Sequence, residues 1–345
     1  NAAFSPTLSN DLTEPTIIHW HGLHVPARDD GHPADAIQPA GRYEYDFQIL
    51  NRAGTYWYHT HAHERTAQQV YYGLAGLFIV EDDDEERISK ELDLQFGQTD
   101  IPLVIQDRTF TANGDLIYYQ NPMGAMDGFL GETILTNLTY RPYLDISSRI
   151  YRFRILNGSN ARIYRLAFIK KFSAMTFQVI GNDGGLLDRP YNVTEVFLAP
   201  GERVDVLLDA RASIRGDVIW LKSLPFFDSE SGMGGMMDGG MGMMQPGALP
   251  NGSSFPILKL TVTEKTAYGR QIPESLSTIP ERDSDEADTR TFELGFFMMQ
   301  WFINGWSFEM DEVPVKVAKN TTGIWQIDNP GPGANQLRPS MGMMG

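Results

Sequence analysis

The sequence predicts an all-β protein built from more than one sandwich domain. Its apolar residues fall in short runs rich in valine, isoleucine, threonine and aromatic residues, and clusters of glycine, proline, asparagine and aspartate separate the runs. Few segments keep a helical period, and 64–72 is the one stretch where we expect a helical turn. With 345 residues and 42% hydrophobic content, the chain can hold two to three domains with packed cores.

The histidines carry the strongest functional signal. All seven lie between positions 19 and 63, where His19 and His21 flank a tryptophan and His59 and His61 flank a threonine. Because side chains alternate between the faces of a strand, the two histidines of each pair point to the same side. A single buried histidine is more often a core residue than a ligand. Two such pairs on neighbouring strands, however, predict a metal site, since imidazole binds copper, zinc, iron and nickel.

Segments throughout the chain resemble the multicopper oxidases, the family of laccases, cuprous oxidases and ascorbate oxidase. The most specific likeness lies around the two histidine pairs, in 16–23 and 54–63, and it continues in 73–80. Further similar segments are Pro102–Asp107, Arg152–Gly158, Asn182–Leu187, Pro200–Val204 and Phe302–Gly305. The likeness is greatest to bacterial laccases and periplasmic cuprous oxidases. It implies tandem cupredoxin-like domains, each a Greek-key β-sandwich.

The resemblance divides the chain into three domain-like regions. Residues 1–85 are expected to be a partial first cupredoxin-like domain with both histidine pairs, and 100–265 a complete second one. Residues 86–99 and 266–287 are expected to be linkers, the first of them acidic, and 288–345 the incomplete start of a third domain. The chain is therefore expected to be truncated at both ends.

The resemblance also implies a copper centre at the histidines. His19 would bind the type 2 copper, and His21, His59 and His61 would bind the type 3 pair. In the family, the third domain supplies four more histidines and the ligands of the type 1 copper, a cysteine among them. This chain has no cysteine and no histidine after position 63. It is expected to hold half of the trinuclear site and no type 1 site.

Asp30, eleven residues after His19, has two open interpretations. In the cuprous-oxidase group a carboxylate at this place helps to deliver protons to reduced oxygen, which predicts a catalytic role for Asp30. The alternative is a turn residue, because Asp29-Asp30-Gly31 also favours a turn.

Residues 229–246 form an insert rich in methionine and glycine. Its methionines are Met233, Met236, Met237, Met241, Met243 and Met244. Thioether sulfur is a soft ligand that favours Cu(I), and related cuprous oxidases carry Met-rich segments over the substrate entrance. We expect this loop to handle Cu(I) or substrate; the alternative is a functionally neutral linker.

The predicted function is that of a copper-dependent oxidase of the laccase type in the periplasm or outside the cell. It would take single electrons from phenols or Cu(I) and reduce dioxygen to water. The alternatives are a non-catalytic copper-binding module and a half-enzyme completed by oligomerisation or by a second chain. With a net charge of −16, nucleic acid is not an expected partner. No apolar run reaches the roughly 18–20 residues of a membrane span, and the acidic clusters Glu81–Glu86 and Glu281–Asp288 are expected to be solvated linkers.

Overall fold

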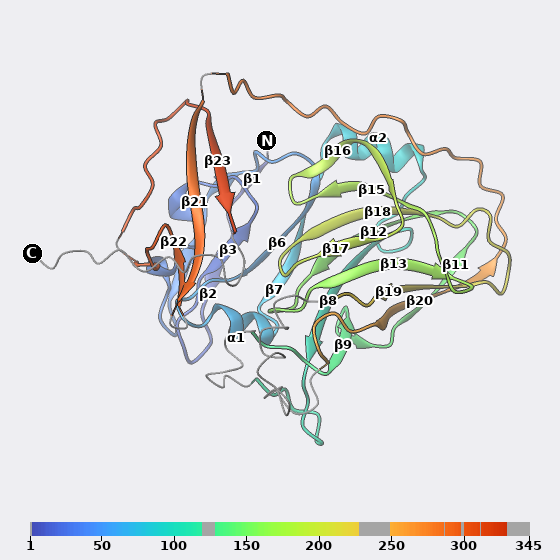
Figure 1. Cartoon of the computed structure of the whole chain (residues 1–345), viewed down its shortest axis with the longest axis horizontal. Helices are drawn as coiled ribbons and strands as arrows, with labels where there is room; N and C mark the ends of the chain where they lie inside the picture. Colours follow the sequence, from blue (N-terminus) through green and yellow to red (C-terminus); the bar gives the residue numbers. More distant parts are fainter. Residues whose placement is uncertain are drawn as a thin grey trace, which may run out of the picture. The chain divides into compact units, whose positions relative to one another are not determined.

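The computed structural model divides the chain into two compact units, Asn1–Thr278 and Ile279–Gly345. It describes residues 2–118, 128–227, 249–285, 287–297, 300–310 and 312–329. Strands dominate both units (Figure 1), which confirms the all-β prediction. None of the helices in these ranges is long and apolar enough to cross a membrane.

The first unit begins with a group of small antiparallel sheets, here called the N-terminal module. Its largest sheet has the order β3 (Ile18–His21), β6 (Gly54–Thr60) and β7 (Ala75–Val80). Two strand pairs accompany it, β1 (Ala3–Phe4) with β5 (Phe47–Gln48) and β2 (Thr7–Ser9) with β4 (Arg42–Glu44). Helix α1 (Thr66–Tyr71) follows β6, where the sequence predicted a helical turn.

An aromatic core holds the N-terminal module together. Trp20 is 6% exposed, and its ring centroid lies 5.3 Å from those of Phe4 and Tyr45. Trp20 therefore points into the core of the module. Because β3 alternates its faces, the histidines on either side of Trp20 point the other way.

The rest of the first unit is a two-layered structure, here called the large sandwich. One sheet has the order β10 (Thr139–Tyr140), β9 (Thr133–Thr136), β8 (Asp100–Arg108), β12 (Ile150–Asn157), β18 (Arg203–Asp209), β15 (Phe177–Asn182) and β16 (Gly185–Val193). The other has the order β11 (Tyr143–Ser147), β20 (Phe255–Glu264), β19 (Val218–Ser223), β13 (Tyr164–Lys170) and β14 (Ser173–Ala174), with β17 (Val196–Leu198) beside β13.

The core of the large sandwich lies between its two sheets. On β12, alternate residues Tyr151, Phe153 and Ile155 enter this core. The residues between them, Arg152 and Arg154, are also fully buried but lie on the opposite face of the strand. Something must therefore cover and neutralise two arginines on the outside of the sheet.

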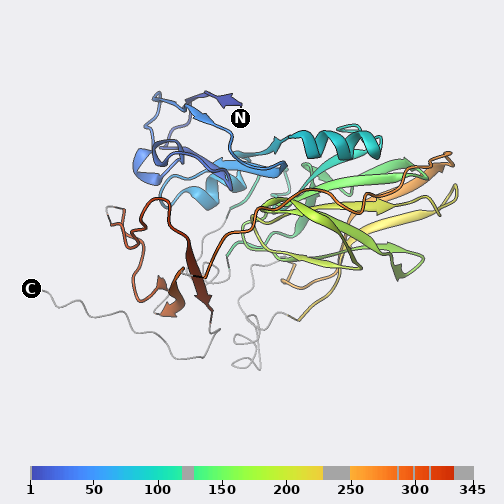
Figure 2. The same cartoon turned by 90° about the horizontal axis from the view of Figure 1, so that it is seen from above.

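That cover includes helix α2 (Asp83–Glu91), which lies alongside the strands of the large sandwich (Figure 2). The side chain of Asp82 accepts a hydrogen bond from the backbone of Glu85 at 3.0 Å and caps the helix. Acidic residues in the first turn favour the helix through its dipole. The predicted acidic linker 86–99 thus begins inside a helix. The expectation of a solvated cluster is wrong for Glu85, which is 2% exposed.

A buried ion network joins α2 to the sheet. Arg152 donates hydrogen bonds to Glu85 and, at 2.6 Å, to Asp205. Arg154 donates to Glu85 at 2.7 Å and binds Asp100 through both Nε and Nη2. Each carboxylate is thus paired and hydrogen-bonded, as a buried charge requires.

The network also reaches the strand that carries His59. Thr55 on β6 donates its hydroxyl hydrogen bond to Asp205 at 2.7 Å. Burial alone would raise the pKa of Asp205, but the charges of Arg152 and Arg154 and the Thr55 hydroxyl outweigh burial and lower it. Asp205 therefore ties the N-terminal module to the large sandwich through an ionised carboxylate.

The lowered pKa of Asp205 predicts sensitivity to acid. Between the ordinary pKa of 3.8 and the lower pKa of the folded state, only the unfolded chain binds the proton. The stability that Asp205 contributes is complete above that ordinary pKa and falls as the pH drops through this window. Urea unfolding of wild type and of Asp205→Asn, measured from neutral pH to about pH 3, gives the free energy of unfolding of each. The two values should approach one another as the pH falls. A difference in unfolding free energy that stays constant with pH would contradict the prediction. The control is Asp115→Asn at an exposed position, whose difference from wild type should not change with pH.

The first part of the second predicted linker 266–287, up to Thr278, belongs to the first unit and packs into it. Leu276 is fully buried, and its carbonyl accepts a hydrogen bond from Arg87 of α2 at 2.6 Å. Tyr268 donates to the carbonyl of Leu92 at 2.5 Å. The boundary between the two units falls after Thr278, inside this segment.

The described part of the second unit contains one small sheet. β21 (Asp288–Phe297) pairs antiparallel with β22 (Gln300–Ile303) and parallel with β23 (Gly323–Asp328). These strands lie where the start of a third domain was expected, and the domain boundaries themselves remain predictions.

Candidate metal centre

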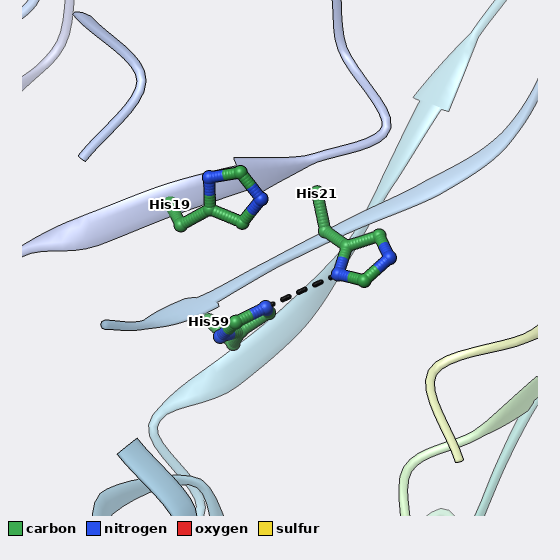
Figure 3. Close-up of side chains that lie close together, drawn as sticks. All are labelled: His19, His21 and His59. Carbon is green, nitrogen blue, oxygen red and sulfur yellow. Dashed lines mark hydrogen bonds between the residues drawn. The ribbon is translucent and has the colours of Figure 1, made fainter. Parts of the chain in front are cut away.

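The pairing of β3 with β6 places the two histidine pairs side by side. His19 lies directly opposite His59, and His21 lies opposite Trp57. One ring nitrogen each from His19, His21 and His59 lies within 4.8 Å of the others. Figure 3 shows the three rings close together, with a dashed line joining His21 and His59. Three of the four predicted ligands thus meet in one cluster.

His61 lies just beyond the end of β6, at the edge of this cluster. Its backbone N–H donates to the carbonyl of Ile17 at 2.9 Å, which continues the pairing by one step. Its ring centroid is 5.3 Å from that of His19 and 5.8 Å from that of His59. Its Nδ1 is buried and has no hydrogen-bond partner among the residues that the structure describes. A buried polar atom without a partner is costly unless a ligand binds it.

Hydrogen bonds set the tautomers of two of the rings. His19 Nδ1 lies 2.7 Å from the carbonyl oxygen of Asp30, and His59 Nδ1 lies 2.8 Å from that of Thr60. Because a carbonyl only accepts, Nδ1 carries the proton in both neutral rings and Nε2 keeps its lone pair. This is the usual way in which a protein orients a metal-binding histidine.

His21 differs from His19 and His59, because it turns Nδ1 rather than Nε2 toward the cluster. Its Nδ1 lies 3.2 Å from Nε2 of His59 (Figure 3). Two nitrogens that each lie about 2.0 Å from one ion at a tetrahedral angle are about 3.3 Å apart. This spacing fits a nitrogen-bound metal ion.

The environment keeps two of the rings neutral. Burial, then the charge of Arg203 and the neighbouring histidines, lower the pKa of His21 to about 3. Burial is also the main cause that lowers the pKa of His59 to about 4. Burial would lower the pKa of His19 too, but its hydrogen bonds to Asp30 outweigh burial and raise it. His21 and His59 are therefore neutral near pH 7, as metal binding requires.

Asp30 is a turn residue whose carboxylate also lies beside the histidine cluster. It ends the short 3₁₀ turn Ala27–Asp29, and its carboxylate Oδ1 lies 3.4 Å from Nδ1 of His19. The hydrogen bond with His19 lowers the pKa of Asp30. Its side chain is 49% exposed, so it touches both solvent and a ring of the cluster. Its catalytic role remains a prediction.

Gly31 allows the Asp30 turn to pack against β3. Its φ is +75°, and a Cβ there would lie 2.0 Å from the carbonyl oxygen of Ile18. We expect Gly31→Ala to displace β3 at His19, and to destabilise the protein by more than the roughly 1–3 kcal/mol of a left-handed alanine.

The matched control for Gly31 is Gly97→Ala. Gly97 has φ +78° but nothing within 4 Å of a Cβ, so only the backbone strain should appear. Chemical denaturation of both variants measures the difference. Equal losses of stability would mean that the contact with Ile18 is unimportant.

Residues outside the histidine pairs also surround the cluster, Trp57 on β6 and Arg203 in the large sandwich, and sequence reasoning missed them. The ring centroid of Trp57 lies 4.4 Å from that of His59 and 5.0 Å from that of His21. Arg203, on β18, acts on His21 through its charge. Its segment Pro200–Val204 stood out only by family likeness. The six methionines of 229–246 lie outside the described residues.

A histidine cluster on one face of two paired strands, beside a large β-sandwich, indicates a metal-binding protein of the all-β class. Multicopper oxidase family profiles match residues 5–85 and residues 139–221. The chain belongs to the multicopper oxidase family, whose cofactor is copper. The prediction of tandem cupredoxin-like domains is confirmed by this family and by the solved structures that the chain resembles.

Three relatives illustrate the likeness. The chain is 37% identical over 202 residues to the multicopper oxidase mco of Staphylococcus aureus, covering 59% of this chain and 43% of the relative. It is 31% identical over 347 residues to the laccase of Bacillus subtilis, covering 93% and 62%. It is 46% identical to the solved McoA multicopper oxidase of Aquifex aeolicus, with a TM-score of 0.79 and coverage of 88% and 62%. The chain thus spans less than two thirds of each of these relatives.

Proposed function

We propose that the chain is part of a copper-dependent oxidase of the laccase type. This enzyme would oxidise phenols or Cu(I) one electron at a time and reduce dioxygen to water. The observation that carries the proposal is the cluster of His19, His21 and His59, whose ring nitrogens lie within 4.8 Å of one another. In this family, such a cluster indicates copper ligation rather than core packing.

Each histidine has a separate task in this proposal. His19 and His59 present Nε2, because their Nδ1 atoms are held by backbone carbonyls. His21 presents Nδ1 beside Nε2 of His59, and the ring of His61 lies at the edge of the cluster, beside that of His19. Copper, when bound, would supply the one-electron redox chemistry that dioxygen reduction requires. Buried neighbours such as Trp57 limit the access of water from the core side.

Asp30 is the residue that we propose for proton delivery. Its exposed carboxylate can take a proton from solvent, and its Oδ1 is 3.4 Å from the ring of His19. Reduction of dioxygen to water consumes protons, so a group that reaches from solvent to the cluster meets a chemical need. The family likeness further supports a periplasmic or secreted location and dioxygen with a phenolic or Cu(I) reductant as partners.

The proposal predicts distinct behaviour for the purified 345-residue chain. Copper should bind, with imidazole nitrogen couplings in the electron paramagnetic resonance (EPR) spectrum. No blue copper–thiolate absorption should appear, because the chain has no cysteine. We expect weak copper binding and slow phenol oxidation, since no thiolate route delivers electrons to the cluster.

The decisive measurement is the reaction with dioxygen. Copper bound to the chain is first reduced with ascorbate, and the recovery of the Cu(II) signal on mixing with oxygen is then followed. Recovery much faster than that of free copper under the same conditions supports the oxidase. Copper that binds but is not reoxidised in this way would instead indicate a non-catalytic copper-binding module. Phenol turnover at ordinary laccase rates would reveal an electron route that the cluster does not explain.

A further inference from the structure

Arg203 connects the large sandwich with the strands that carry the histidines. It begins β18, and its side chain is 3% exposed. Its Nε donates to the carbonyl of Thr55 on β6 at 3.1 Å, and its Nη1 donates to the carbonyl of Gly201 at 3.0 Å. Asp183 holds the same guanidinium through its carboxylate at 2.8 Å and through its carbonyl at 3.1 Å. One buried side chain thus binds three backbone carbonyls, those of Thr55, Asp183 and Gly201.

Two glycines bring this guanidinium next to His21. Gly22 directly follows His21, and a Cβ on Gly22 would lie 2.9 Å from Nη2 of Arg203. Gly201 covers the ring of His21, because a Cβ there would lie 3.6 Å from Cε1 of His21 and 3.5 Å from the ring of Trp57. Arg203 therefore lies against the residue after His21 and holds the turn that covers the His21 ring.

His21 needs such support more than its neighbours do. The rings of His19 and His59 are each oriented by a hydrogen bond from Nδ1 to a backbone carbonyl. His21 turns its Nδ1 into the cluster instead, and within the described ranges no carbonyl orients its ring in this way. The direction of His21 Nδ1 must then come from packing against its surroundings.

We infer that Arg203 is a positioning residue for His21, so that the large sandwich determines the geometry of the metal centre. The inference rests on the proposed function, since it treats His21 as a copper ligand. The rigid fork of a guanidinium can bind the Thr55 and Gly201 carbonyls together, whereas a lysine ammonium is a point charge on a flexible stem. The shape of the side chain is therefore needed here, and its charge alone is insufficient.

The test uses the whole 345-residue chain, with copper(II) ions alone as the probe. Arg203→Gln and Arg203→Lys should each weaken copper binding about tenfold, in the range typical for groups that orient metal ligands. Both should also change the nitrogen couplings in the EPR spectrum of the bound Cu(II), a signature that a loss of stability alone does not alter. Circular dichroism at the temperature of the measurement establishes that each variant is folded.

The matched control is Arg52→Gln. Arg52 also joins the N-terminal module to the large sandwich, through the carbonyl of Leu186 at 2.7 Å and the hydroxyl of Ser277 at 2.5 Å. Within the described part of the chain, none of its side-chain hydrogen bonds reaches Gly22 or Gly201, and it is not among the atoms nearest to either glycine. This variant should lower stability while the affinity and the EPR spectrum of bound copper stay unchanged.

The outcomes separate the inference from the proposed function. Wild-type affinity and spectrum in both Arg203 variants, or full rescue by lysine, would overturn the positioning role and leave the copper site intact. Copper binding in wild type that His59→Ala does not weaken would overturn the site itself, and the inference with it. If Arg203→Gln does not fold, Arg203→Lys and Asp183→Asn decide: a changed spectrum supports the inference, and an unchanged one overturns it.

Discussion

Replacing His59 by alanine is expected to remove copper binding from the cluster. His59 is the central ligand, since its Nε2 lies 3.2 Å from Nδ1 of His21 and its strand position is directly opposite His19. Its loss deprives the site of a ligand and separates the remaining nitrogens. The affinity for copper should fall by more than the roughly 10–100-fold that loss of a supporting group costs. Isothermal titration with copper, under conditions where the variant is folded, measures this change.

His63→Ala is the matched control for His59→Ala. His63 is a histidine four residues further along the chain, its side chain is 48% exposed, and it lies 3.9 Å from Glu64. Its removal should leave the copper affinity within about a factor of three, which is less than 1 kcal/mol in binding free energy. If both variants bind copper as wild type does, the histidine cluster is not the site.

Arg154→Met is expected to have the largest effect on stability. The substitution roughly preserves the volume of the side chain, but it leaves the buried carboxylates of Asp100 and Glu85 without their 2.7 Å partners. Removing one member of a buried ion pair typically costs about 3–5 kcal/mol. Guanidinium unfolding followed by circular dichroism should show this loss in the transition of the first unit.

A surface ion pair on α2, the helix that carries Glu85, serves as the control for the loss of stability in Arg154→Met. Lys90 pairs with Glu86 on the solvent side of α2, where the two side chains are 72% and 63% exposed. Lys90→Ala should leave the stability almost unchanged, because water screens exposed charges. A loss below about 1 kcal/mol in Arg154→Met would show that water or rearrangement replaces the missing partner.

Local patterns in the sequence were sufficient to predict the fold class and the histidine cluster. The alternation of side chains along a strand depends only on backbone geometry, so His19 with His21 could be assigned to one face and Trp20 to the other. The helical turn after His61 and the turn at Asp30 also follow from neighbouring residues. The family of the chain was likewise apparent from the segments around both histidine pairs.

Tertiary packing decided what local pattern could not. The run at Glu81–Glu86 was expected to be solvated, but Glu85 is buried, and two arginines from β12, far along the chain, bind its carboxylate on the face of the sheet that α2 covers. Arg203 gave no local sign of a role, since its partners Thr55 and Gly22 lie in another part of the sequence.

The sequence by itself therefore determined the strand architecture, the four clustered histidines and the membership of a copper-binding family. The tertiary structure alone decided which nitrogens face one another, which carboxylates remain charged inside the protein, and which arginine holds the His21 turn. The physical reason is the separation along the sequence over which each property is set. The direction of a side chain is set within a few residues, whereas its burial and its partners are set by segments that meet only when the chain has folded.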